Sequence, residues 1–293
     1  MEEEAGLKPK KIPAKVPRSE NPELRSFKLT IAYIGTNYFG WQKQAAEGGA
    51  ATVQEMLEKA ARQVLRQKRV ILHGSGRTDT GVHARAQVAH LRAEVDLPPE
   101  TLIKALNAHL PEDIRITKLE AAAPEFHAQL SVKAKTYRYF ILNVNKGKDP
   151  IHWPFLRPYS WFVTYPLDLA AMQKALDLLR GEHDFKSFQN TGTPVEDTVR
   201  EILEARIVVH NQDPHEAPPW MPNAELGAQL IEIRVRGTGF LKQMVRTIVG
   251  TIVEVGRGKI PPEEISRILQ SKNRSASGMT APAYGLFMDR VEY

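Results

Sequence analysis

Apolar and polar residues first alternate along the chain and then change to a helical spacing. In FKLTIAYIGT (27–36) every second residue from Phe27 to Tyr33 is apolar, which is typical of a half-buried strand. Thr52, with Glu55 three residues later, forms a capping box before apolar residues at helical spacing, and this predicts an amphipathic helix. The same patterns predict strands over 69–74, 84–93 and 113–122 and a second helix over 99–110. The order strand, helix, strand, strand, helix, strand is that of a split βαβ unit.

The second part of the chain repeats a similar order of elements. KTYRYFILNV (135–144) is apolar on both faces, which predicts a strand in the centre of a sheet. Helical spacing predicts a helix over 166–181 that stops at Gly181. Further patterns predict strands over 198–211, 229–240 and 285–293, helices over 241–256 and 262–270, and a polar, proline-rich excursion at 211–229. We therefore expect two α+β halves that meet near 125–135, with a cleft where they join.

The chain before the first strand has no apolar periodicity. Residues 1–25 contain four prolines and several lysines, and proline at this density can neither pair into a sheet nor continue a helix. We expect a flexible basic arm over 1–25, an N-terminal half over 26–128 and a C-terminal half over 129–293. The arm could follow a nucleic acid or remain a solvated tail, and the sequence leaves both open.

Composition limits the classes of function. The chain of 293 residues carries 40 Lys and Arg against 34 Asp and Glu, and the formal net charge of +6 weakly favours a polyanionic partner. It has no cysteine, which excludes disulfides and thiolate chemistry and fits a reducing compartment. No apolar run is long enough for a membrane span, and MEEEAGLKPK at the start has no signal-peptide pattern. We expect a cytoplasmic protein without a membrane partner.

The stretch GSGRTDTGVHAR (74–85) places one carboxylate, Asp79, between Arg77 and His83 in a glycine-rich connection of two predicted strands. Its glycine spacing matches neither the dinucleotide fingerprint nor a phosphate loop. One interpretation is an ordinary strand connection, in which glycines supply positive φ and the aspartate bonds its own backbone. The other is a catalytic loop, because a neighbouring cation such as Arg77 favours the charged form of a carboxylate, and an ionised carboxylate can act as a nucleophile.

Two other chemistries fit the sequence less well. A glycosidase needs a second acid, and none stands at a fixed spacing from Asp79, although the fold could still bring one near. The spacings of His73, His83 and His90 match no standard metal-ligand motif. We therefore expect no metal site.

The motif GRTDTGVHA (76–84) resembles the catalytic signature of the bacterial tRNA pseudouridine synthase A family. The resemblance extends over about 27–293. It includes, in order, YIGTNYFGWQKQ, TVQEMLEKA, LNAHLPEDIRI, FHAQLSVKAKTYRY, GEHDFKSF, FLKQMVRTIVGTIVEVGRG and APAYGLF. Thr80 stands where the family usually has alanine and Ile34 where it usually has aspartate, and the arm and the excursion are additional.

The resemblance implies a fold and a reaction. The fold is α+β, with two ferredoxin-like halves that form a mixed, mostly antiparallel sheet flanked by helices, and with a central cleft. The reaction is the isomerisation of uridine to pseudouridine in the anticodon stem-loop of tRNA, at positions 38–40, by a homodimer without a metal or cofactor. Asp79 would be the nucleophile, Arg77 would displace the target base, Tyr137 would lie against the uracil and Arg246 would pair with Asp79.

The chemistry of this reaction suits these residues, but the pattern alone leaves alternatives open. Nothing is oxidised and no group is carried in, so no cofactor is needed, and the carboxylate could attack ribose C1′ or uracil C6. By pattern alone Tyr137 is better explained as a core aromatic, and Arg246 lies off the apolar stripe of its helix. Alternative functions are a synthase acting on a different RNA uridine, a non-catalytic RNA-binding protein, and a glycosidase-like hydrolase.

Overall fold

The computed structural model describes residues 24–43, 51–144, 153–192, 195, 197–210 and 228–293. The strands are β1 (Arg25–Tyr33), β2 (Leu72–Gly74), β3 (His83–Ala93), β4 (Ile114–Ala122), β5 (Ala134–Val144), β6 (Trp161–Val163), β7 (Gly181–Asp184), β8 (Val199–His210), β9 (Ala228–Gly237) and β10 (Leu286–Glu292). The helices are α1 (Val53–Leu65), α2 (Pro99–Ala108), α3 (Trp153–Leu156), α4 (Leu169–Asp177), α5 (Met244–Gly256) and α6 (Glu264–Ser271).

All these strands belong to one sheet. Its order is β4-β1-β3-β10-β5-β9-β8-β7, with β2 paired to β3 and β6 paired to β5. The β3–β10 and β5–β6 pairs are parallel and the others are antiparallel, which confirms the expected mixed, mostly antiparallel sheet. β5 lies between β10 and β9, as its two apolar faces predicted.

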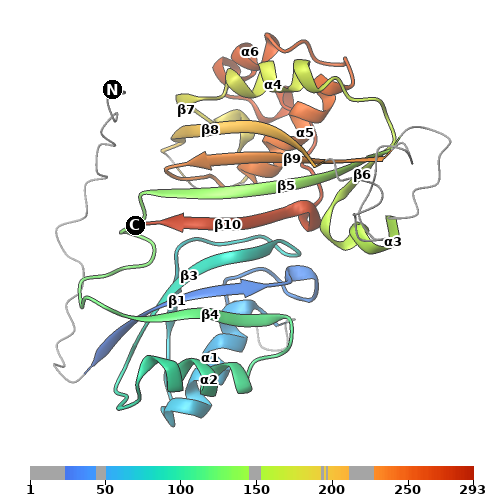
Figure 1. The fold of residues 1–293 in the computed structure, drawn as a ribbon. Coiled ribbons are helices and arrows are strands. Elements are labelled where there is room, and N and C mark those ends of the chain that lie inside the picture. Colours follow the sequence, from blue (N-terminus) through green and yellow to red (C-terminus); the bar gives the residue numbers. More distant parts are fainter. Residues whose placement is uncertain (1–23, 44–50, 145–152, 193–194, 196, 211–227) are drawn as a thin grey trace, which may run out of the picture.

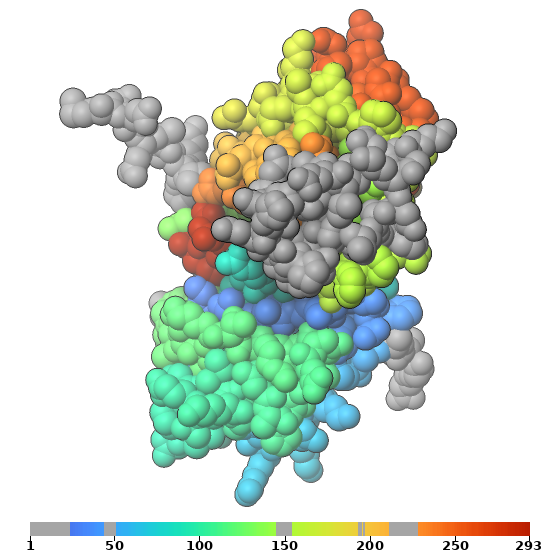
Figure 2. All heavy atoms as spheres, turned by 45° about the vertical axis from the view of Figure 1, so that its right-hand side comes forward, coloured from blue at the N-terminus to red at the C-terminus, as the bar shows by residue number. Residues whose placement is uncertain are grey.

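The last strand of the chain joins the two halves of the sheet. β10 lies between β3 of the N-terminal half and β5 of the C-terminal half (Figure 1). Its pairing with β3 covers only Phe287 with His83 and Met288 with Ala84, so the backbone seam between the halves is short. Figure 2 shows the halves as two lobes, the blue-to-green one below and the yellow-to-red one above.

The helices accompany the strands of their own half. In Figure 1 α1 and α2 lie beside the strands of the N-terminal half, and α4, α5 and α6 lie beside those of the C-terminal half. The side chain of Thr52 accepts a hydrogen bond from the backbone of Glu55, so the predicted cap of α1 is formed. The predicted order of elements from β1 to β4 is confirmed, whereas the short elements α3, β6 and β7 were not predicted.

Helix α5 is buried on nearly all sides. Eleven of its 13 residues are buried, although its sequence predicted only an apolar stripe. Gly250 explains the second buried face, because a Cβ there would collide with the backbone carbonyl of Met279. The segment near Met279 therefore covers α5 from the side away from the core, and Arg246 and Glu254 are its two residues that are not buried.

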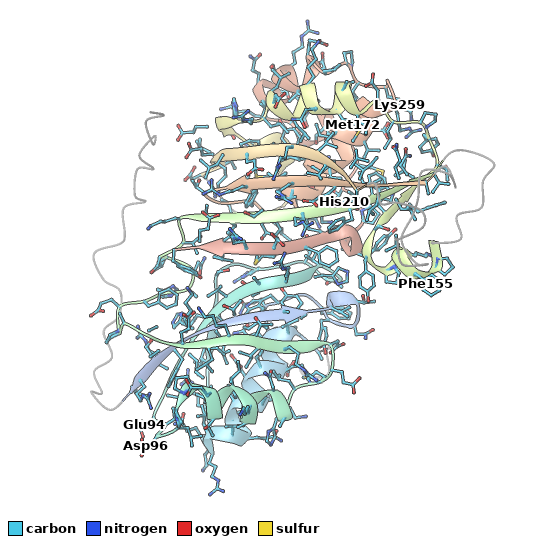
Figure 3. All side chains as sticks on the ribbon, in the orientation of Figure 1. Glu94, Asp96, Phe155, Met172, His210 and Lys259 are labelled. Atoms are coloured by element: carbon cyan, nitrogen blue, oxygen red, sulfur yellow. The ribbon has the colours of Figure 1, made fainter. Side chains whose placement is uncertain are left out.

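A cluster of ion pairs stabilises the sheet of the C-terminal half. The side chain of Glu232 on β9 is fully buried and accepts hydrogen bonds from Arg138 at 2.6 Å, Arg234 at 2.8 Å and His210 at 2.8 Å (His210 is labelled in Figure 3). Burial alone would raise the pKa of Glu232, but these three donors lower it from 4.5 to about 2. The carboxylate thus stays charged because three donors bind its two oxygens.

Several predictions concern segments at the edges of the described residues. β1 begins at Arg25, two residues earlier than predicted, because Arg25 pairs with Ala93 and its guanidinium donates to the carbonyl of Val95. Residue 25 is therefore part of the sheet and not of the arm. The rest of the arm up to residue 23, and residues 211–227 of the excursion, lie outside the described residues. Within the described part of the chain, none of the helices has the length and apolar character needed to cross a membrane.

Candidate active site

The loop that carries Asp79 connects β2 to β3, and residues 74–82 are called the Asp79 loop below. Val82 N donates to the carbonyl of Asp79 at 3.2 Å, which closes a tight turn. Gly81 lies in this turn at φ +77°, a conformation that favours glycine. Trp41 N also donates to the carbonyl of Thr78 at 3.2 Å, so the segment before α1 holds the loop from one side.

Hydrogen bonds between buried polar groups hold the loop in place. Ser75 and Gln87 are fully buried, and Ser75 Oγ donates to Gln87 Oε1 at 2.6 Å while Gln87 Nε2 donates to the carbonyl of Gly76 at 3.0 Å. The hydroxyls of Tyr33 and Thr78 share a hydrogen bond of 2.8 Å. Because each buried polar group has a partner, the loop backbone has little freedom to move. The glycine-rich loop is therefore a rigid support that holds Asp79 in place.

Arg246 of α5 forms an ion pair with Asp79. Arg246 Nη1 donates to Asp79 Oδ2 at 3.0 Å, and Arg246 Nε donates to the carbonyl of Ala281 at 2.7 Å. The two side chains are 14% and 25% exposed, so the pair is only partly screened by water. Two contacts from one planar guanidinium fix its orientation against the carboxylate.

The cation beside Asp79 is therefore not the one that the local sequence suggested. Arg77 was expected to favour the charged carboxylate, but in the described part of the chain the ion pair that Asp79 forms is with Arg246. The side chain of Arg77 is exposed and lines the cleft. Proximity in sequence does not set side-chain direction in a turn, whereas α5 brings its one arginine, which is partly buried, to face the carboxylate.

Tyr137 lies in the floor of the same site. Its side chain is 7% exposed, and its ring meets Phe240 edge to face with centroids 5.1 Å apart. Burial raises the pKa of Tyr137, and the nearby Tyr33 and Asp79 raise it further. Tyr137 is thus both a core aromatic and a residue that lines the cleft beside Asp79.

The site opens into a cleft of about 1320 Å³ between the two halves. Its N-terminal wall comes from residues in 39–82 and its C-terminal wall from residues in 129–286. The cations that line it are Lys43, Arg77, Lys135, Arg200, Lys242 and Arg246, and Asp79 is the one carboxylate among its described lining residues. A concave surface with this excess of positive charge attracts a polyanion.

Phe240 and Lys135 are among the lining residues that sequence reasoning missed. Phe240 packs on Tyr137, and Lys135 donates from Nζ to the carbonyl of Ser75 at 2.6 Å. Lys135 and Tyr137 are two residues apart on β5 and so point to the same face of the strand. This spacing could have indicated that Lys135 lies beside Tyr137, whereas no local pattern linked Phe240 to Tyr137.

Two of the histidines considered in the sequence, His73 and His90, lie together with His127. The centroid of the His90 ring is 5.0 Å from that of His73 and 4.7 Å from that of His127. Burial first, and then the neighbouring His127, His73 and Arg92, lower the pKa of His90 to about 3. No group of three acidic or histidine side chains in the part of the chain that the structure describes is placed to hold a metal ion.

A carboxylate paired with an arginine at the base of a cationic cleft defines an enzyme-like site for a polyanion. Comparison with known proteins indicates the same class of protein. The family described as tRNA pseudouridine synthase matches residues 29–130 and 175–293. The chain is 42% identical over 269 residues to a tRNA pseudouridine synthase A of Geobacillus sp. strain WCH70, covering 92% of this chain and 98% of that protein. It is 37% identical over 270 residues to that of Pseudothermotoga lettingae, covering 92% of this chain and all (100%) of that protein. The chain belongs to the tRNA pseudouridine synthase family.

The chain is also distantly similar to a solved structure. A chain of a Cbf5-Nop10-Gar1 complex aligns with 96% of this chain and 60% of its own length, at 11% identity and a TM-score of 0.30. A likeness this low says nothing about the site.

Proposed function

We propose that this protein isomerises uridine to pseudouridine in tRNA, with Asp79 as the nucleophile. The observation that carries the proposal is the Asp79–Arg246 pair of 3.0 Å at the base of a cleft whose other charged lining residues are cations. Membership of the tRNA pseudouridine synthase family supports the reaction and the substrate class. An isomerase of this kind needs no co-reactant, because the product has the same atomic composition as the uridine and only one hydrogen exchanges with solvent.

The reaction can be written on these residues. A carboxylate oxygen of Asp79 forms a bond to ribose C1′ or to uracil C6, and the N1–C1′ bond breaks in the course of the exchange. The uracil turns in the site, and C5 bonds to C1′ as the bond to Asp79 is released. C5 loses its hydrogen to solvent as a proton, and N1 takes up a proton.

The other residues would present the base and the carboxylate. Flipping a paired base out of a stem costs about a few kcal/mol. The exposed guanidinium of Arg77, a planar group, would enter the stack and offset part of this free energy. Tyr137 would lie against the uracil, where a π face tolerates sequence differences around the target. Arg246 would orient Asp79 through its second contact with Ala281.

We further propose the finer features of this activity. The target uridines would lie in the anticodon stem-loop at positions 38–40, the active form would be a homodimer, and the reaction would take place in the cytoplasm without a metal or cofactor. The absence of cysteine fits a reducing compartment. The division into halves at residues 128 and 129 is likewise a proposal, supported by the cleft between the strands on either side of it.

The test is the release of tritium from tRNA labelled with [5-³H]uridine. We expect the wild-type protein to release tritium and Asp79→Asn to release none, with melting temperature and tRNA affinity close to wild type. Tritium release by Asp79→Asn would remove Asp79 from the nucleophile's role. Wild-type protein that binds tRNA without release would indicate a non-catalytic RNA-binding protein, and free uracil among the products would indicate a hydrolase.

A further inference from the structure

Lys135 connects the two halves through a hydrogen bond to the backbone of the Asp79 loop. It stands on β5 of the C-terminal half, and its Nζ donates to the carbonyl of Ser75, at 2.6 Å, in the N-terminal half. Ser75 is fully buried and lies four residues before Asp79. A hydrogen bond from a charged donor to a buried carbonyl is stronger than one between neutral groups. The contact is therefore able to set the position of the loop relative to β5.

Gly76 lies against the end of the Lys135 side chain. A Cβ at Gly76 would lie 2.7 Å from Lys135 Nζ and 3.7 Å from Lys135 Cε. Gly76 is not among the glycines with positive φ, so its backbone conformation does not require glycine. What an alanine would disturb at this position is the ammonium group of Lys135.

Lys135 and Tyr137 share one face of one strand. Because β5 is a central strand, paired along Lys135–Val144 with β9 and along Ala134–Tyr139 with β10, its backbone is rigid. The same strand therefore carries the tyrosine proposed to lie against the uracil and the lysine that holds the loop of the proposed nucleophile. Lys135 thus links the backbone of the Asp79 loop to the strand that carries Tyr137.

We propose that Lys135 is a positioning residue, which fixes the Asp79 loop relative to Tyr137 and thereby places the Asp79 carboxylate for attack. This inference rests on the proposed function. Lys135 acts through the backbone of Ser75 and not through the substrate. A displacement of about 1 Å at a reacting centre lowers turnover by about 100-fold, so a loop without this contact turns over slowly while its cleft still binds RNA.

The first experiment compares the wild-type protein with Lys135→Met and Lys135→Arg over the full chain. Single-turnover tritium release is measured together with tRNA affinity at several salt concentrations. We expect Lys135→Met to lower the single-turnover rate by about 10–100-fold with tRNA affinity and salt slope unchanged, and Lys135→Arg to recover a large part of the rate. A melting temperature within a few degrees of wild type shows that the variants fold.

A contact of Lys135 with an RNA phosphate would give a different result. Loss of such a contact weakens binding to all RNAs and reduces the salt slope by about one contact. That outcome for Lys135→Met, or an unchanged rate, would overturn the positioning role. A wild-type protein without tritium release would instead refute the proposed function itself, so the two failures are distinguishable.

The second experiment uses the contact between Gly76 and Lys135. Gly76→Ala in the wild-type background displaces the ammonium group, and we expect the single-turnover rate to fall by about tenfold. In the Lys135→Ala background the space is empty, so the same substitution should change the rate by less than about twofold, because effects of contacting residues are not additive. Equal effects in both backgrounds would show that Gly76 acts independently of Lys135 and would contradict the inference.

Discussion

Replacing Arg246 by glutamine tests whether the ion pair with Asp79 serves the reaction. The substitution removes one contact to the Asp79 carboxylate and one to the carbonyl of Ala281. A hydrogen bond to a charged group is worth about 1.5–3 kcal/mol, and the partial exposure of the pair places it at about 2 kcal/mol. Since about 1.4 kcal/mol corresponds to a tenfold change in rate, we expect turnover to fall about 30-fold.

The assay is tritium release under single-turnover conditions, with tRNA binding measured in parallel. Arg246→Lys should lie between wild type and Arg246→Gln, because a lysine keeps the charge but cannot make both contacts of the planar guanidinium. Turnover of Arg246→Gln at the wild-type rate would refute the reasoning that the pair orients the nucleophile.

Arg257, which follows the C-terminal end of α5, provides a matched control for Arg246 near its N-terminal end. Its Nη1 lies 2.6 Å from Glu254 Oε1, and the two side chains are 21% and 17% exposed, much like the Arg246–Asp79 pair. Arg257 is not among the residues that line the cleft. Arg257→Gln and Arg246→Gln should therefore lower the melting temperature by similar amounts, but Arg257→Gln should leave turnover within about twofold of wild type.

Three further predictions follow from charges on the two halves. Because the unfolded chain protonates Glu232 near 4.5 and the folded one only at about 2, its stabilising effect is present above pH 4.5 and is lost as pH falls toward 2. Glu232→Gln should thus lower the urea midpoint at pH 7 and flatten its fall between those values, and an unchanged fall would refute the role of Glu232. His90 is neutral in the folded protein down to about pH 3 and takes up a proton near 6.5 when unfolded, so it contributes stability that is lost as pH falls through this window. His90→Asn keeps an acceptor for Ala128 N–H and should be more stable than wild type at pH 4 relative to pH 7, measured by urea unfolding; equal pH profiles would contradict this. Finally, the logarithm of tRNA affinity should fall linearly with the logarithm of salt concentration, by about 0.7–0.9 per phosphate contacted, and affinity independent of salt would exclude a role for the cleft cations.

Local patterns were sufficient for most of the secondary structure. The alternation in β1 and the capping box at Thr52 are properties of neighbouring residues, and both elements form where these patterns predicted them. Two apolar faces indicated the central place of β5. Elements of three or four residues, such as β6 and β7, have too few positions to show a period and were missed.

The glycine-rich turn around Asp79 and its resemblance to a known family were also visible in the sequence. The direction of the side chains around it was not. The sequence suggested Arg77 as the neighbouring cation, but the partner is Arg246, which is 167 residues away along the chain. From the residues alone this pairing could not be derived, and only the family resemblance pointed to it.

The sequence by itself determined the local elements, the single carboxylate in its turn and the excess of positive charge. The first two depend on residues close together in the chain, and the net charge is a sum over all charged residues. The tertiary structure alone decided which charges meet. β10 returns from the end of the chain to lie between β3 and β5, and this placement brings α5 and its Arg246 to the Asp79 loop and Lys135 beneath it. Strand order joins segments that share no local pattern, and burial of α5 on nearly all sides leaves Arg246 at the cleft, where it meets the carboxylate.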